Sequence, residues 1–269
     1  MKITIITACR NAAETLKTTL ESVVRQRHAG FALEYIVVDG ASTDGTVGLL
    51  REYECVFAER SPAVSFRWIS EPDRNMYDGL NKGIGAATGD IVGILNSDDV
   101  FAADDVLERV AAFWADHPGI DVSYGDVRFA ERGGYGSVDE LRRAKTKRYL
   151  TGRYFRRWMF RFATFPAHPS TFVRRKCYEE HGLHSLDYPI CADFEMMLRL
   201  FVRHRVRSAY VPLCTTVMRP DGLSTNGFRS KIEVNAQDLA ALRANGVWSC
   251  LPLIYAKYVF KVWGYFRCG

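Results

Sequence analysis

The chain has 269 residues, of which 48% are hydrophobic and 25% are charged, and its formal net charge is +5. This length suits one large α/β domain, or a domain with a tail, and allows a substantial buried core. The mild net charge excludes no class of protein, although nine Lys and Arg residues fall within residues 142–161. The seven cysteines lie far apart without a CxxC pair, which favours free thiols in a reducing compartment over disulfides or a zinc site.

The first hundred residues alternate between strand patterns and helix patterns. The opening, MKITIITACR, gains charge too quickly for a signal peptide, so we expect a cytosolic protein. Residues 2–8 predict a strand, and apolar residues recur at helical spacing from Leu16 to Val24 before a second strand at 34–38. This order predicts a right-handed βαβ unit with a parallel sheet. The next predicted elements are a strand at 64–70, a helix whose buried face carries Met76, Leu80, Ile84 and Ala87, and a strand at 90–95.

The second half of the chain gives a less regular pattern. A helix is predicted at 104–114, and a strand at 120–129 alternates enough to indicate that the sheet becomes mixed. Residues 130–165 predict a long loop, which in a compact domain is usually functional or mobile. The remaining predicted elements are a strand at 169–175, a helix at 192–204, a strand at 207–219, a turn-rich segment at 220–227 and a helix that ends before Gly246.

Aspartates follow two of the predicted parallel strands. Asp39 ends the second strand, and Asp98 and Asp99 follow the apolar run of the fourth. Ligands bind at the carboxyl ends of the strands in open α/β sheets. Two hard oxygen donors there suit a divalent cation that bridges nucleotide phosphates. The alternative is an ordinary capped turn, since Asn, Ser and Asp are common turn residues.

Seven segments, in this order, resemble glycosyltransferase family 2, and most closely its bacterial cell-surface polysaccharide members. They are TACRN, EYIVVDGASTDGT, SEPDRNMYDGLNKGI, ILNSDD, HPSTFVRR, ADFEMMLRL and DGLS, and they cover residues 1 to about 226. The resemblance implies the A-type glycosyltransferase fold, an α/β fold with a Rossmann-like mixed, mainly parallel sheet flanked by helices. We expect a nucleotide-binding half at 1–101, an acceptor half at 102–226 and a helical extension at 227–269.

The resemblance also assigns roles to particular residues. By position in the family's motifs, Thr7, Asn11 and Asp39 would hold the nucleobase, although Asp39 could instead only cap the next helix. The segment that faces the ribose and phosphates would contribute Glu71, Asp73 and Lys82, with an exposed helix lysine as the alternative for Lys82.

The acidic motif departs from the family pattern of two aspartates separated by one residue. It reads Asn96, Ser97, Asp98, Asp99, so which aspartate ligates the metal and which contacts the ribose stays open. Asn96 is a candidate amide ligand or ribose contact. Hard oxygen ligands at a diphosphate imply Mn²⁺ or Mg²⁺.

A later motif of the family carries the catalytic base of inverting members. Asp193 matches that base, while the acid that often precedes it is replaced by Ala192. Asp193 could alternatively cap its own helix. Three further residues are candidate acceptor or phosphate contacts: His168, Arg174 and Arg219.

The predicted function is inverting, metal-dependent transfer of a hexosyl or N-acetylhexosaminyl group from a nucleotide sugar, foremost a UDP-sugar. The expected acceptor is a lipid-linked or other oligosaccharide in surface polysaccharide synthesis, and a homodimer is compatible with the sequence. A sugar nucleotidyltransferase would need a glycine-rich loop after the first strand, where this chain has TACRN. A non-catalytic module could bind membrane or nucleic acid through residues 142–161, but no nucleic-acid motif accompanies them, so we expect no nucleic-acid partner.

The last segment, residues 247–267, is rich in aromatic and aliphatic residues. Pro252, Lys257 and Lys261 interrupt it, so it is too short in uncharged residues to span a bilayer. Lysines four apart among aromatics suit a helix that lies in the membrane interface with its ammonium groups at the headgroups. Residues 142–161 would add attraction to anionic lipid, which predicts a peripheral protein on the cytoplasmic membrane face. The alternative is that the segment packs on the catalytic domain or on a second subunit.

Overall fold

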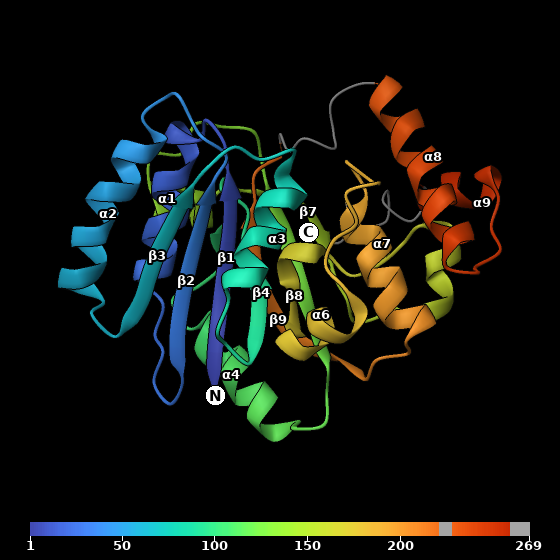
Figure 1. Ribbon diagram of the computed structural model, residues 1–269, viewed down its shortest axis with the longest axis horizontal. Helices are drawn as coiled ribbons and strands as arrows, with labels where there is room; N and C mark the ends of the chain where they lie inside the picture. Colours follow the sequence, from blue (N-terminus) through green and yellow to red (C-terminus); the bar gives the residue numbers. More distant parts are fainter. Residues whose placement is uncertain (221–227, 259–269) are drawn as a thin grey trace.

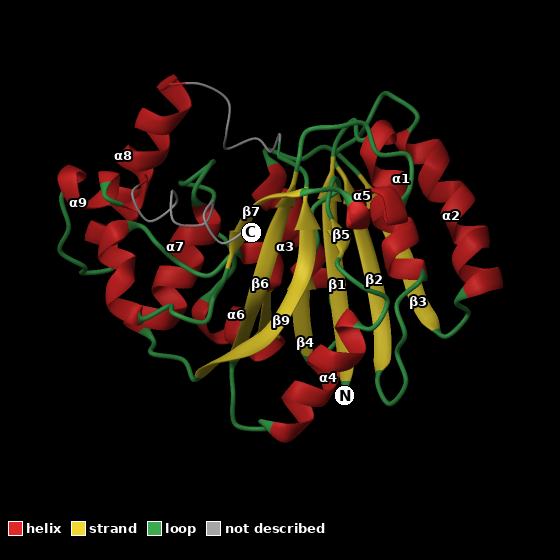
Figure 2. Ribbon diagram, turned by 180° about the vertical axis from the view of Figure 1, so that it is seen from behind, coloured by secondary structure: helices red, strands yellow, loops and turns green. Residues whose placement is uncertain are grey.

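The structure is a computed structural model that describes residues 1–220 and 228–258. Its centre is a mixed sheet of nine strands in the order β3-β2-β1-β4-β8-β6-β9-β5, with β7 paired to β6. Helices α3 (Met76–Ala86) and α6 (Arg175–His181) cover the face seen in Figure 1. Helices α1 (Ala13–Val24), α4 (Val106–Asp116) and α5 (Val138–Arg143) cover the other face, seen in Figure 2. The predicted α/β fold with a mixed sheet between helices is confirmed.

The first four strands run parallel, as the βαβ pattern predicts. They are β1 (Lys2–Cys9), β2 (Ala32–Asp39), β3 (Val64–Ser70) and β4 (Ile91–Ile94), with α2 (Thr46–Arg60) between β2 and β3. The register pairs Cys9 with Asp39 and Asp39 with Ser70. The carboxyl ends of these strands therefore bring segments far apart in the sequence to one edge of the sheet.

The other half of the sheet is where its direction changes. Strand β8 (Thr171–Arg174) runs antiparallel between β4 and β6 (Val122–Ala130). Strand β9 (Ser208–Met218) is parallel to β6, and the short β5 (Val100–Phe101) is antiparallel to β9. Because β5 begins directly after Asp99, the acidic motif is a turn held at both ends by the sheet.

The prediction of a long loop at residues 130–165 is wrong. This segment contains α5, the strand β7 (Thr146–Leu150) and a 3₁₀ helix, η1 (Arg157–Phe162). Ser137 caps α5 by accepting a hydrogen bond from the Glu140 amide at 3.2 Å, and Val138 and Leu141 are buried. The 3₁₀ turn η2 (His168–Ser170) follows, and α7 (Ala192–Leu198) continues into a π-helical turn, η3 (Arg199–Arg203).

The C-terminal helices pack on the rest of the described structure. Helix α8 (Phe228–Ala244) contacts α7, and α9 (Leu251–Tyr255) contacts α8 and η1, at the end of the molecule far from α2 (Figure 1). Lys257 donates to Asp238 at 2.6 Å, and each side chain is only 5% exposed. The prediction that Lys257 faces lipid headgroups is therefore wrong for this structure, and packing on the domain describes residues 228–258 better.

Parts of two predictions lie outside the described residues. These are the DGLS motif and the end of the predicted interface helix with Lys261. Within the described ranges, no helix has the length and hydropathy needed to cross a bilayer.

Candidate active site

Asp39 closes the turn between β2 and α2. Its side chain is fully buried, and its carboxylate accepts hydrogen bonds from the Ser42 amide at 3.0 Å, the Ser42 hydroxyl and the Ser70 hydroxyl at 2.7 Å. Asn11, at φ 50°, joins the same turn, because its backbone N–H donates to Ser42 Oγ and its side chain accepts from the Thr43 amide. Asn is one of the residues that tolerate this left-handed conformation. The predicted nucleobase residues Asp39 and Asn11 are thus brought together.

Thr7 is placed differently from Asp39 and Asn11. Its side chain is fully buried inside the sheet, and its hydroxyl donates to the Leu95 carbonyl at 2.7 Å. A side-chain contact between Thr7 and a nucleobase does not fit this position. Thr7 instead ties β1 to the start of the acidic turn.

An ion cluster follows β3 at the same edge of the sheet; we call Glu71, Asp73 and Lys82 the edge ion cluster. Lys82 Nζ forms ion pairs with Asp73 and, at 3.0 Å, with Glu71. Burial opposes the charge of Lys82, but its hydrogen bonds to Asp73 and Glu71 outweigh burial and raise its pKa. Asp73 lies against Gly79 of α3, where an added Cβ would come within 2.8 Å of a carboxylate oxygen. The three predicted residues therefore form one charged group whose position depends on that glycine.

The acidic turn between β4 and β5 holds Asp98 and Asp99 in different environments. Asp99 is 1% exposed and accepts hydrogen bonds from Asn96 Nδ2 at 2.8 Å and from the Arg219 amide at 3.2 Å. Asp98 is partly exposed and lines a pocket of about 530 Å³. Burial raises the pKa of both carboxyls, and the charge of Asp98 raises the pKa of Asp99 further.

A glycine-rich loop forms the opposite wall of this pocket. Tyr135 lies in this loop, and Arg219 places its guanidinium 5.5 Å from the Tyr135 ring centre. Arg219 also donates to the Asp98 carbonyl at 2.9 Å and to the Tyr135 carbonyl at 3.3 Å. Arg219 therefore links the loop to the acidic turn. The pocket is lined by Glu14, Thr15, Asp98, Gly133, Gly134, Tyr135, Gly136, Arg219 and Pro220.

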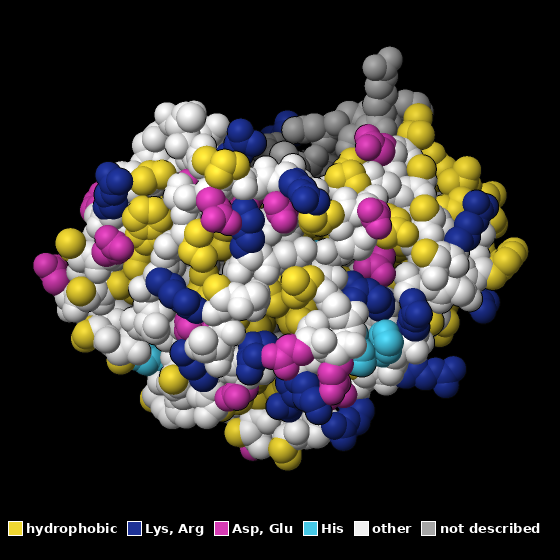
Figure 3. All heavy atoms as spheres, viewed as in Figure 1, with side chains coloured by type: hydrophobic (Ala, Val, Ile, Leu, Met, Phe, Trp, Pro, Cys, Tyr) yellow, Lys and Arg dark blue, Asp and Glu magenta, His cyan; other side chains and the backbone are white. Residues whose placement is uncertain are grey.

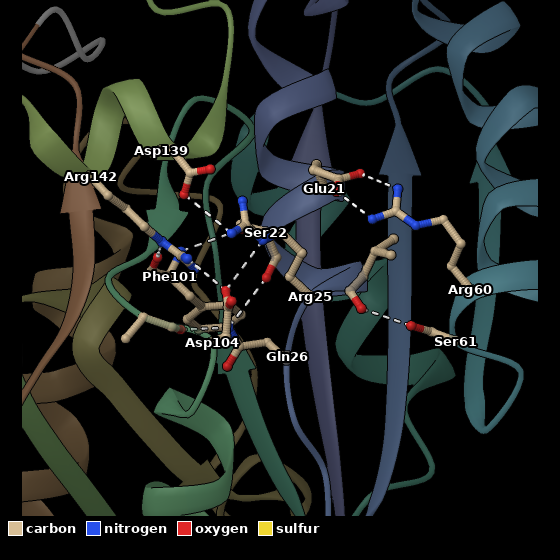
Figure 4. Close-up of polar contacts among 12 residues, drawn as sticks. Glu21, Ser22, Arg25, Gln26, Arg60, Ser61, Phe101, Asp104, Asp139 and Arg142 are labelled. Atoms are coloured by element: carbon tan, nitrogen blue, oxygen red, sulfur yellow. Dashed lines mark hydrogen bonds and ion pairs between the residues drawn. The ribbon is translucent and has the colours of Figure 1, made fainter.

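Helix α5 anchors the end of the glycine-rich loop, as Figure 4 shows. Arg142 donates to Asp104 at 2.6 Å and to the Phe101 carbonyl at 2.8 Å, while Arg25, the C-cap residue of α1, donates to Asp139 at 3.2 Å. These contacts bind α5 to α1 and to the chain after β5. Arg142, the first residue of the basic stretch, thus has a structural partner. Sequence reasoning missed the glycine-rich loop, although its GGYG run lies directly before the capped helix.

Asp193 lies in the first turn of α7 beside α3. Its Oδ1 accepts hydrogen bonds from Tyr77 Oη at 3.1 Å and from the Phe194 amide at 2.8 Å. Burial raises the pKa of Asp193 in spite of these two bonds. Because Tyr77 is in the first turn of α3, just past the carboxyl end of β3, Asp193 lies at the ligand-binding edge of the sheet. The bond from the Phe194 amide is a contact within the first turn of the helix, as the helix-cap alternative expected. The Tyr77 hydroxyl is a second partner of the carboxylate, which the sequence did not reveal.

The two remaining candidate acceptor or phosphate contacts lie in different places: His168 is near Asp193, and Arg174 is far from it. His168 is buried and its Nε2 lies 3.3 Å from His184 Nε2, while the His184 ring stacks on Tyr77 at 5.6 Å. Burial lowers the pKa of His168 to about 4, so this ring is neutral at pH 7. Arg174 pairs with Ile91 at the opposite edge of the sheet and donates to the Ile120 carbonyl at 2.8 Å. The prediction that Arg174 contacts acceptor or phosphate is therefore withdrawn.

The site chemistry suits a cation, although the donors are few. Two carboxylates share a poorly hydrated turn and both are harder to ionise than normal, so a divalent ion at Asp98 would offset unbalanced negative charge. In the described part of the chain, no group of three or more His, Cys, Asp and Glu side chains could hold a metal by itself. Further ligands would have to come from a bound phosphate or from water, as is usual for Mg²⁺.

Comparisons with known proteins agree with this fold. A sequence model of glycosyl transferase family 2 matches residues 4–182. A PGL/p-HBAD biosynthesis glycosyltransferase of Mycobacterium bovis is 30% identical over 210 residues, which cover 77% of this chain and 72% of the relative. An uncharacterized glycosyltransferase of Mycobacterium tuberculosis is 31% identical over 197 residues, covering 73% of this chain and 68% of that protein.

Two solved structures share the fold at low sequence identity. A fragment of S. aureus TarS in complex with UDP superposes with a TM-score of 0.63 at 16% identity and is matched over 90% of this chain. This chain spans 65% of the length of that fragment. The mannosyltransferase PcManGT from Pyrobaculum calidifontis, in complex with GDP-Man and Mn²⁺, gives a TM-score of 0.57 at 19% identity, covering 96% of this chain and 78% of that one.

The fold is a mixed sheet with polar residues at its carboxyl edge. The matching family model and the curated relatives are both described as glycosyltransferases, so the protein is a glycosyltransferase. The chain belongs to glycosyltransferase family 2.

Proposed function

We propose that this glycosyltransferase moves a hexosyl or N-acetylhexosaminyl group from a nucleotide sugar to an acceptor hydroxyl, with inversion at the anomeric carbon. The observation that carries the proposal is Asp193, a carboxylate of raised pKa held by Tyr77 at the ligand-binding edge. The structural neighbours bind UDP, UDP-GlcNAc, or GDP-Man with Mn²⁺, which supports a nucleotide-sugar donor, with a UDP-sugar as first choice.

Donor binding would use the residues of the parallel strands. Asp39 and Asn11 fix the turn against which the nucleobase would lie, and Lys82 would turn from its carboxylate partners to the diphosphate as a mobile point charge. Asp98, with Asp99 behind it, would hold Mn²⁺ or Mg²⁺. A bound divalent ion would offset the charge that develops on the leaving diphosphate.

Acceptor activation would fall to Asp193. A general base works best when its pKa approaches the working pH, and burial moves the pKa of Asp193 in that direction. Tyr77 orients Oδ1, which leaves Oδ2 to take the proton from the attacking hydroxyl. A single carboxylate is enough for proton transfer, because a cation at the diphosphate replaces a general acid.

The acceptor we propose is a lipid-linked glycan in the synthesis of a bacterial surface polysaccharide. Support comes from the motif resemblance and from a relative named for PGL/p-HBAD biosynthesis. Such an acceptor would hold the enzyme at the cytoplasmic face of the membrane. Arg219, at the pocket of Asp98, is the candidate contact to an acceptor phosphate. The neutral, buried His168 is linked to Asp193 through His184 and Tyr77, so its candidate role is to position the base.

The test is a donor screen by nucleotide release, with Mn²⁺ and with EDTA, on the wild type and two matched variants. Asp193→Asn keeps the shape of the side chain but removes its basicity, so turnover should fall by about 10² to 10⁴ while donor binding persists. Asp187→Asn tests the other candidate for the base, since Asp187 is an exposed carboxylate on the segment that leads into α7. Near wild-type turnover for Asp193→Asn, with loss for Asp187→Asn, would move the base to Asp187.

The metal is tested separately by calorimetry with UDP. Binding should weaken with EDTA and in Asp98→Asn, because a carboxylate that would hold the cation is then missing. Equal affinity with Mn²⁺ and with EDTA would contradict the metal role.

A further inference from the structure

The segment around η1, residues 153–162, which we call the η1 segment, divides its side chains between the core and the surface. Phe155 and Phe160 are buried, and the Phe160 ring lies 5.8 Å from that of Phe194 on α7. The residues between and beside them point outward: Tyr154 and Trp158 are 55% and 59% exposed. The buried Phe155 and Phe160 rings anchor this short segment on the core. The exposed Tyr154 and Trp158 rings therefore have a fixed base.

The C-terminal extension brings more exposed apolar side chains to the same place. Ser249 donates to the Arg161 carbonyl at 2.6 Å, and α9 contacts η1. Trp248 is 69% exposed, and Leu251 and Tyr255 are each 45% exposed. Figure 3 shows hydrophobic side chains gathered over α8 and α9 at the right edge of that face, with Lys or Arg side chains beside them.

The charge of both segments is of one sign. Residues 141–178 and 239–269 contain no Asp or Glu. Four arginines of the η1 segment are exposed, and none of them forms an ion pair with another residue that the structure describes: Arg153, Arg156, Arg157 and Arg161. Arg156 donates to the Phe155 carbonyl and Arg157 to the Val206 carbonyl, while the Arg153 guanidinium lies 5.8 Å from the centre of the Tyr154 ring.

We infer that η1 and the segment 248–255 form one membrane-docking surface for a bilayer that contains anionic phospholipid. Exposed Trp and Tyr beside Leu are the side chains that enter the interfacial region, with an apolar body and a polar tip. The exposed arginines around them, which form no ion pair with the described residues, match the phosphates of anionic lipid. The buried Lys257 belongs to the support of this surface, not to the surface itself.

This inference goes beyond sugar transfer, because lipid binding can be measured without donor or acceptor. The probe is a set of vesicles with equal parts of phosphatidylglycerol and phosphatidylcholine, compared with phosphatidylcholine alone, in a sedimentation assay with the full chain at low salt. The wild type should sediment with the anionic vesicles and lose binding as salt is raised.

Two variants separate charge from insertion. Arg153→Ser with Arg156→Ser should weaken binding about 25-fold, or about fivefold for each charge near the surface. Trp158→Ser with Trp248→Ser should weaken it about tenfold or more and should also reduce what binding remains at high salt. All four side chains are exposed, so the urea midpoint of each variant should match the wild type.

The matched control removes two exposed arginines far from η1, by Arg51→Ser on α2 with Arg109→Ser on α4. It should change vesicle binding less than twofold, which excludes a general effect of net charge. The inference is overturned if the wild type binds neither vesicle, or if the control weakens binding as much as the η1 variants. It is also overturned if single-stranded RNA binds this surface and vesicles do not.

Discussion

The buried ion pair between α8 and Lys257, two residues past α9, should contribute much of the stability of the C-terminal extension. Lys257 Nζ lies 2.6 Å from Asp238, with both side chains 5% exposed. Lys257→Met removes one charge and leaves the carboxylate buried without its partner. Breaking a buried pair in this way costs about 3–5 kcal/mol. A domain of this size loses about 2 °C of midpoint per kcal/mol, so the thermal midpoint should fall by about 6–10 °C.

The double variant Lys257→Met with Asp238→Asn separates loss of the pair from an unpaired charge. Replacing both charges is often close to neutral, so we expect it to recover most of the loss. The matched control is Lys176→Met, which breaks the exposed pair with Glu180, of 3.1 Å, on α6. Exposed pairs contribute about 0–1 kcal/mol, so this control should barely change the midpoint.

The assay is thermal unfolding followed by circular dichroism, together with hydrogen exchange of α8. If Lys257→Met behaves like Lys176→Met in both measurements, the extension is not held by this pair. Faster exchange in α8 with an unchanged midpoint would also refute the expected coupling of the extension to global unfolding.

The remaining predictions concern the site and its pH dependence. Tyr77→Phe removes a hydrogen bond to the charged form of Asp193, worth about 1.5–3 kcal/mol, so the pKa of Asp193 should rise and the acid limb of kcat/KM should move about 1–2 pH units upward. An unchanged pH profile would refute this positioning role. Gly79→Ala should weaken UDP binding by displacing the edge ion cluster, while Gly85→Ala on the same helix, where a Cβ meets nothing within 4 Å, should not. The pKa of His168 is about 4, below its ordinary 6.5, so folding disfavours the protonated ring and stability is lost as pH falls between these values. Urea unfolding should show a loss of up to about 3 kcal/mol that is smaller in His168→Gln.

The sequence predicted the parallel half of the sheet well, because its strands are long apolar runs between turn residues. It failed at residues 130–165, where α5 has six residues and β7 has five. Six residues are too few for the helical spacing of apolar residues to be recognised. The strand β7 forms because it pairs with β6, and this pairing cannot be read from the local sequence. The cap at Ser137 was the readable signal for α5.

The prediction of the buried face of α3, the helix that carries Lys82, was wrong in one position. Hydropathy selected Met76 for the buried face of α3, yet Met76 is 37% exposed and Tyr77 is 3% exposed. Tyr77 is buried because its hydroxyl finds the Ile190 carbonyl at 2.9 Å and Asp193 at 3.1 Å. Those partners are more than a hundred positions away in the chain, so no periodicity could reveal them. The same holds for Lys257, whose burial depends on Asp238 of another helix.

The charges at the carboxyl edge differ in how well the chain itself satisfies them. Lys82 is neutralised by Glu71 and Asp73, and Asp39 is satisfied by two serines. Asp98 and Asp99 are different, since burial raises the pKa of both and the charge of Asp98 raises the pKa of Asp99 further. A diphosphate alone would add negative charge beside carboxylates that are already hard to ionise, whereas a diphosphate with a divalent cation would bring the missing positive charge. This charge pattern supports the proposal that the edge of the sheet binds nucleotide and cation together.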